Sequence, residues 1–93
     1  MTIIVQHKVR DFGTWKSVFD QSADVSRSHS ATGHEVYRSP DDPSEVTVVT
    51  HFSSGEQAKA FAESPSLREA MERAGVVGKP AITWLEDVER VTY

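Results

Sequence analysis

His7 is the side chain whose type and position in this sequence most favour catalysis. It alternates in step with three apolar residues of the segment Thr2–Val9, namely Ile3, Val5 and Val9. Because alternate residues of a strand share one face, His7 is predicted to lie on the face that packs against the core. The pKa of an imidazole lies near neutrality and shifts readily on partial burial, so a histidine there can act as a general base. The competing interpretation is a core histidine that bonds to the backbone or to a helix side chain.

Large aromatic side chains and one methionine could wall a pocket beside His7. Trp15 lies four residues after Asp11, a predicted helix N-cap, and Phe19 follows it at helical spacing. Ordinary core packing is the alternative explanation for such an apolar stripe. We predict that the following residues contact a ligand, with His34 and Tyr37 at the mouth of the cleft: Trp15, Phe19, His34, Tyr37, Phe52, Phe61, Met71 and Trp84.

Metal and cofactor chemistry have little support in the sequence. The chain has four histidines and no cysteine, and no pair of histidines shows the spacing that is typical of zinc sites. One alternative has His34 and His51 converging across a hairpin beside an acidic residue, and the same histidines are the candidates for a haem ligand. Nucleophile-elbow, P-loop and dinucleotide-binding motifs are all missing from the sequence. We therefore expect no metal and no cofactor.

Composition favours one small globular domain over residues 1–93. Hydrophobic residues make up 38% and charged residues 26% of the chain, and the formal net charge is −4. Basic runs are missing, so we expect no nucleic-acid partner and no membrane partner. No segment has the pattern of a signal peptide or the roughly 20 apolar residues of a membrane span, so a cytoplasmic location is expected.

The elements that must position these side chains follow one another in the order β-α-β-β-α-β. After the strand Thr2–Val9, a helix with an apolar stripe from Phe12 to Val25 is predicted to fade through residues 26–30 and stop at Gly33. A hairpin follows over His34–Phe52, in which Pro40 and Pro43 interrupt the strand ladder.

A second helical region is predicted after the hairpin. Ser53 or Ser54 caps its start, and Ser64 and Pro65 restart it. Gly75 and Gly78-Lys79-Pro80 end it before a last strand over residues 81–91. This order is the ferredoxin-like α+β pattern: a four-stranded antiparallel sheet with the helices on one face. The other face would carry Ile4, Val49 and Leu85, so we expect a homodimer that covers it.

The sequence as a whole resembles the dimeric α/β-barrel superfamily, in particular small bacterial proteins described as cyclases or as antibiotic-biosynthesis-monooxygenase-like. The resemblance lies in three stretches: His7-Lys8-Val9-Arg10-Asp11-Phe12 with Trp15 and Phe19, Tyr37-Arg38-x-Pro40-Asp41-Asp42-Pro43, and Ala60-Phe61-Ala62-x-Ser64-x-x-Leu67-Arg68-Glu69-Ala70-Met71.

This resemblance implies two sheets packed face to face in a dimer, with a ligand cleft between sheet and helices in each subunit. It also implies a cofactor-independent oxygenase or a cyclase that acts on a hydrophobic, aromatic, polyketide-like molecule. The alternative function is a homodimer without turnover that binds a small ligand or serves a structural role, because fold membership does not fix function.

Overall fold

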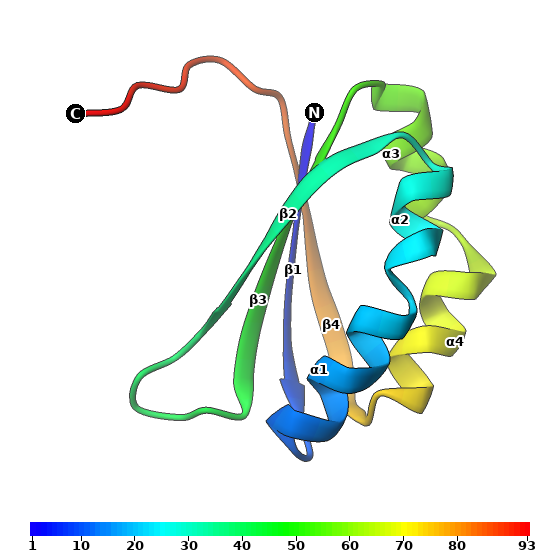
Figure 1. The fold of residues 1–93 in the computed structure, drawn as a ribbon, viewed down its shortest axis with the longest axis vertical. Coiled ribbons are helices and arrows are strands. Elements are labelled where there is room, and N and C mark those ends of the chain that lie inside the picture. Colours follow the sequence, from blue (N-terminus) through cyan, green and yellow to red (C-terminus); the bar gives the residue numbers. More distant parts are fainter.

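The chain forms a four-stranded antiparallel sheet that carries its helices on one face, as Figure 1 shows. The computed structural model describes residues 1–93 except for the side chain of Val25, so the predicted place of Val25 on the helix stripe lies outside the described residues. The elements are β1 (Thr2–Val9), α1 (Phe12–Gln21), α2 (Ala23–Ser28), β2 (Ala31–Arg38), β3 (Glu45–Phe52), α3 (Gly55–Ala62), α4 (Pro65–Arg73) and β4 (Val76–Leu85).

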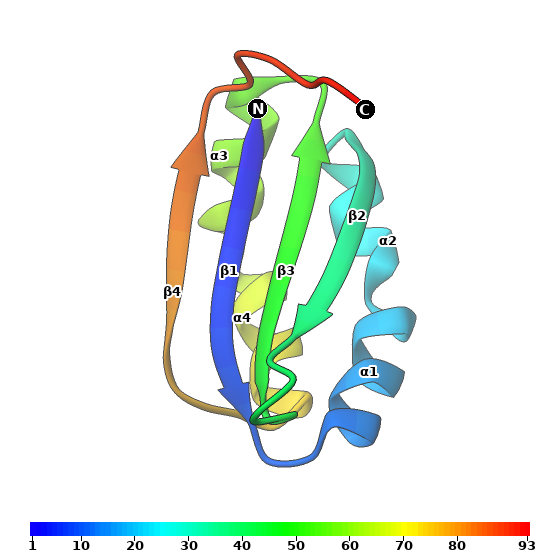
Figure 2. The same cartoon turned by 90° about the vertical axis from the view of Figure 1, so that its left-hand side faces the viewer.

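The strand order in the sheet is β2-β3-β1-β4, and β1 pairs antiparallel with both β3 and β4. Figure 2 shows the sheet from its helix-free side, with the helices behind it. The ferredoxin-like prediction is confirmed, and each predicted helical region consists of two short helices. Among the described residues, no helix is both long and apolar enough to cross a membrane.

Side-chain caps define where three of the helices begin. The Asp11 carboxylate accepts a hydrogen bond from the Thr14 amide at 2.8 Å at the start of α1. Ser54, one of the two serines predicted for this role, caps α3, and Ser64 caps α4 directly before Pro65. Each cap satisfies a backbone N–H that has no partner within its own helix.

The predicted helix stop at Gly33 is wrong. The helical region ends at Ser28, and the left-handed residue that follows is Ser30, with a φ of 66°. The strand β2 therefore begins at Ala31, and Gly33 lies within it. Glycine is the commonest residue at such a left-handed position, but a short polar residue also adopts it, and the sequence pattern does not reveal which one does.

The predicted bounds of the last strand are also wrong, because β4 begins at Val76 and ends at Leu85. In the register, Gln6 pairs with Ala81 and Lys8 with Val77, so the segment 78–80 bulges out of β4 opposite His7. Gly78 supplies the positive φ of 73° that this bulge uses. A bulge accommodates Gly78 and Pro80 without ending the strand.

The core lies between the sheet and the helices and consists of two clusters. One contains Ile3, Val5, Phe52, Ala58 and Phe61, and the other contains Val9, Trp15, Val46, Val48 and Ala74. Alternate residues of β3 face the helices, and all four of them are buried: Val46, Val48, Thr50 and Phe52.

Candidate active site

His7 lies on β1 with its ring between the sheet and the helices. It pairs with Val46 of β3 on one side and faces the β4 bulge on the other. The His7 ring centroid is 5.5 Å from that of Trp15 on α1. Both imidazole nitrogens are buried, and neither has a hydrogen-bond partner among the described residues. Buried polar atoms are nearly always hydrogen-bonded, so these two nitrogens stand out as available to a bound molecule.

Burial also changes the acid–base behaviour of His7. Removal from water lowers the pKa of the imidazole below its ordinary value of 6.5, because the charged form loses its hydration. At neutral pH the ring is therefore uncharged and able to accept a proton. This protonation state is the one that a general base requires.

A cavity of about 60 Å³ adjoins His7, and its walls are mainly apolar. Four of the predicted ligand-contact residues line it together with His7: Trp15, Phe19, Phe61 and Met71. Trp15 and Phe19 stack with their ring centroids 5.0 Å apart, so they form one continuous aromatic wall. Helix α1 supplies these two rings, and α3 and α4 supply Phe61 and Met71.

Three hydroxyl-bearing residues that were not predicted from the sequence also line the cavity: Ser22, Ser26 and Thr50. The Ser22 hydroxyl accepts a hydrogen bond from Arg73 at 3.2 Å. Strand parity signals Thr50, because it alternates with Val46 and Val48 on the helix-facing side of β3. Ser22 and Ser26 are four residues apart, which places them on one side of the helical region.

The other predicted contact residues do not line this cavity. His34 stands on the helix-facing side of β2, with its ring 5.1 Å from that of Phe19 and perpendicular to it. Phe52 packs into the core beside Phe61, with ring centroids 5.2 Å apart. Trp84 lies on the edge strand and is 40% exposed. Tyr37 pairs with Thr47 on the helix-free face and is 55% exposed.

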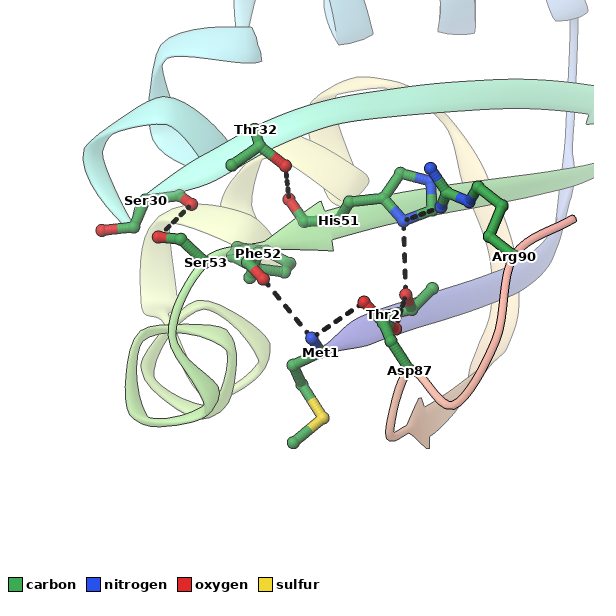
Figure 3. A network of polar contacts seen from close by, with 9 residues as sticks. All are labelled: Met1, Thr2, Ser30, Thr32, His51, Phe52, Ser53, Asp87 and Arg90. Atoms are coloured by element: carbon green, nitrogen blue, oxygen red, sulfur yellow. Dashed lines mark hydrogen bonds and ion pairs between the residues drawn. The ribbon is translucent and has the colours of Figure 1, made fainter.

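His51 lies on the helix-free face, as its strand parity predicts, within a polar network shown in Figure 3. Its Nε2 donates to the Glu35 carboxylate at 2.9 Å, and its Nδ1 lies 3.2 Å from the Thr2 hydroxyl. The Thr2 hydroxyl donates in turn to Asp87, and Arg90 Nη2 lies 3.3 Å from His51 Nδ1. The tail that follows β4 is therefore fixed to the sheet at two points.

The pKa of Asp87 is lowered, first by the Thr2 hydrogen bond and then by the one from the terminal amine.

The alternative that paired His34 with His51 fails on geometry, since His34 pairs with Thr50 and the two rings lie on opposite faces of the sheet. Within the described side chains, no group of three or more histidine, aspartate or glutamate residues could hold a metal ion.

Residues 16–73, more than half of the chain, match the family model described as antibiotic biosynthesis monooxygenase. The chain belongs to this family. The matched segment begins within α1 and ends with α4, so it includes the cavity-lining residues Phe19, Phe61 and Met71 and leaves His7 and Trp15 outside. None of the curated proteins matches the chain.

Several solved structures share the fold. SnoaB, a cofactor-independent oxygenase from Streptomyces nogalater, superposes with a TM-score of 0.71 at 12% identity and covers 94% of this chain and 93% of its own. A protein from Bordetella bronchiseptica classed among the antibiotic biosynthesis monooxygenases gives a TM-score of 0.77 at 16% identity, covering 95% and 96%. Rv0793 from Mycobacterium tuberculosis gives a TM-score of 0.72 at 16% identity, and the match covers 98% of this chain and 97% of Rv0793.

Proposed function

We propose that this member of the family is a cofactor-independent oxygenase of a hydrophobic aromatic molecule, with His7 as the general base. The observation that carries the proposal is the buried imidazole with two unpartnered nitrogens beside an apolar cavity. Membership of the monooxygenase family supports the reaction type, and the similarity of fold to SnoaB supports chemistry without a cofactor.

In the proposed reaction, the substrate transfers a proton to His7 and thereby becomes reactive toward dioxygen. An acidic methylene group, between an aromatic ring and a carbonyl or phenol, would lose a proton to one nitrogen of His7. The carbanion formed beside the new imidazolium is stabilised by it, since opposite charges attract strongly where water is excluded. Reaction of that carbanion with dioxygen gives a balanced conversion in which the methylene group plus O₂ become a carbonyl group plus water.

The aromatic wall supplies orientation for such a substrate. Trp15 and Phe19 stack nearly parallel, at an interplanar angle of 16°, and together offer a wide apolar surface to a flat ring system. The hydroxyl groups of Ser22, Ser26 and Thr50 supply polar contacts within the same walls. A few polar groups in an otherwise apolar pocket are what fixes the orientation of a bound small molecule.

The direct test is oxygen uptake with a panel of anthrone-like and β-diketone compounds. The substitution His7→Gln keeps a side chain of similar size, so the fold should survive while turnover falls about 10²–10⁴-fold, the usual contribution of a general base. The variant Lys59→Gln, at an exposed position of α3 that lines no part of the cavity, serves as the control and should keep its activity. Product formation without oxygen uptake would instead identify a cyclase. Binding with no turnover of any compound would favour the ligand-binding alternative.

We also propose that the protein works as a homodimer joined through the helix-free faces of its sheets. Ile4 and Val49 are direct partners in the β1–β3 register on that face, and both are only partly buried. Leu85, at the end of β4, is on the same face and is 41% exposed. A second sheet would remove these apolar side chains from water. Figure 1 shows the tail leaving the sheet on this helix-free side.

A further inference from the structure

A second hollow lies next to the His7 cavity, between α4 and the edge strand β4. Its volume is about 360 Å³, much larger than the 60 Å³ of the inner cavity. The bulge residues Gly78, Lys79 and Pro80 form one rim, and Arg68 and Glu72 of α4 form the other together with Ser64, the N-cap of that helix. We call this hollow the outer groove.

The inner cavity is small for the kind of substrate that the proposed function requires. A protein cavity of about 150 Å³ is known to bind benzene, whereas a buried water needs about 10–15 Å³. By that comparison, 60 Å³ holds a few water-sized molecules, dioxygen among them, but no fused aromatic ring system. Such a substrate must therefore occupy additional space beyond the inner cavity.

Two side chains of α4, Leu67 and Met71, separate the cavity from the outer groove, because both of them line both spaces. They are four residues apart and so stand on one side of the helix. Neither is fully buried. Methionine is unbranched and adapts its shape readily, so Met71 can move aside without displacing the helix.

The rims of the outer groove carry two cations, Arg68 and Lys79. Within the part of the chain that the structure describes, neither side chain forms an ion pair or a hydrogen bond. Glu72 is the one acidic residue of the lining, so the groove has a local excess of positive charge. The whole chain has a formal net charge of −4, which makes this positive charge a local exception.

We propose that the outer groove is the entrance to the His7 cavity and binds the acidic group of a flat aromatic substrate. In this arrangement Arg68 and Lys79 hold a carboxylate at the rim, and the aromatic ring displaces Met71 and Leu67 to reach Trp15 and His7. This inference rests on the proposed function for the identity of the inner site. The β4 bulge lines the outer groove and lies opposite His7 in the register of the sheet.

A binding measurement tests this entrance without any turnover. The chain has two tryptophans, so Trp84→Phe leaves Trp15 as the only indole, and its fluorescence reports on the inner cavity. The probes are naphthoate, which carries a carboxylate, and naphthylmethanol, its neutral analogue. We expect saturable quenching of Trp15 by naphthoate and weaker binding of naphthylmethanol.

Charge removal should affect the two probes differently. In the Trp84→Phe background, the double substitution Arg68→Gln with Lys79→Gln should weaken naphthoate binding about 5–20-fold, as expected for two partly exposed ion pairs, and added salt should do the same. Naphthylmethanol binding should be unchanged. The matched control is Arg27→Gln, which changes the net charge on α2, far from the groove in sequence, and should leave both affinities unaltered.

The role of Met71 in separating the outer groove from the inner cavity is tested by Met71→Ala. This variant should speed the quenching of Trp15 by both probes, because the opening between the two spaces is wider. Three results would overturn the proposal: no saturable binding of naphthoate, equal naphthoate affinity in the double variant and its parent, or binding that never quenches Trp15. Since these readouts need no catalysis, an inactive but naphthoate-binding protein would refute the oxygenase function and leave the entrance intact.

Discussion

Replacing His7 with leucine should stabilise the folded protein while it removes the proposed base. The imidazole nitrogens are buried without partners among the described residues, and a polar group left in this state costs about 1–3 kcal/mol. Leucine has a similar volume and no polar atom, so it should recover most of that cost against Trp15 and the apolar cavity walls. We expect a gain of about 1–2 kcal/mol in the free energy of unfolding. For a domain of this size, each 1 kcal/mol corresponds to a rise in Tm of about 4–8 °C.

The gain should depend on pH in a defined direction. The pKa of His7 is lowered in the folded state, so below pH 6.5 the unfolded chain binds more protons than the folded chain. The native protein therefore loses stability as the pH falls from 6.5 towards the lowered pKa, and His7→Leu removes this contribution. The difference in Tm between the variant and the native protein should therefore widen as the pH falls below 6.5, and it should be constant above pH 6.5.

Thermal unfolding followed by circular dichroism measures this difference, with protomer concentration held constant because an oligomer unfolds in a concentration-dependent way. His34→Leu is the matched control, since His34 is exposed and its loss should change Tm little. If His7→Leu lowered Tm by several degrees at neutral pH, the imidazole would have to be satisfied in the folded protein. The reasoning that makes His7 an unpartnered base would then be wrong.

Four further predictions concern packing, backbone and assembly. Trp15→Ala should lower stability by about 3–5 kcal/mol in chemical denaturation, because the side chain is only 2% exposed and joins the core to the cavity wall. Gly78→Ala should cost about 1–2 kcal/mol in the same assay, since its φ is +73° although a methyl group would meet open space, whereas Gly33→Ala, with equal space and no positive φ, should cost nothing. The double change Ile4→Glu with Val49→Glu should give monomers or aggregates in light scattering, and a folded monomer of the unmodified protein at micromolar concentration would contradict the dimer. Deleting residues 88–93 should weaken the dimer and lower Tm, because Val88 and Val91 are exposed at 90% and 57% in the single chain and Arg90 contacts His51; unchanged values would show that this tail takes no part in assembly.

The sequence predicted the order of the elements because strand alternation and helix periodicity are local signals. The alternation that placed Val46, Val48, Thr50 and Phe52 toward the helices is visible without any tertiary information. The ends of elements were less predictable. Ser30 rather than Gly33 adopts the left-handed conformation, and the β4 bulge keeps Gly78 within a strand, because pairing with β1 outweighs the local preference to end there.

The candidate site was predictable only in part, for the same reason. Parity placed His7 under the helices, and helical spacing placed Trp15 and Phe19 together. Strand parity did not predict the surroundings of Trp84. This side chain faces the helices as expected, but its strand lies at the edge of the sheet, away from the cavity. The face on which Tyr37 lies depends on the register of the hairpin, in which the turn is closed by backbone hydrogen bonds of Glu45 with Ser39 and Asp42.

The bulge in β4 makes the outer groove adjustable. The three residues 78–80 stand opposite a single residue of β1, while pairing on both sides of them is regular. The length and side chains of this loop can therefore change while the alternation of Ile82 and Trp84 farther along the strand is preserved. Sequence changes at this loop therefore leave the core unaltered. A library of loop variants at residues 78–80 is accordingly a direct route to new substrate selectivity with His7 left in place.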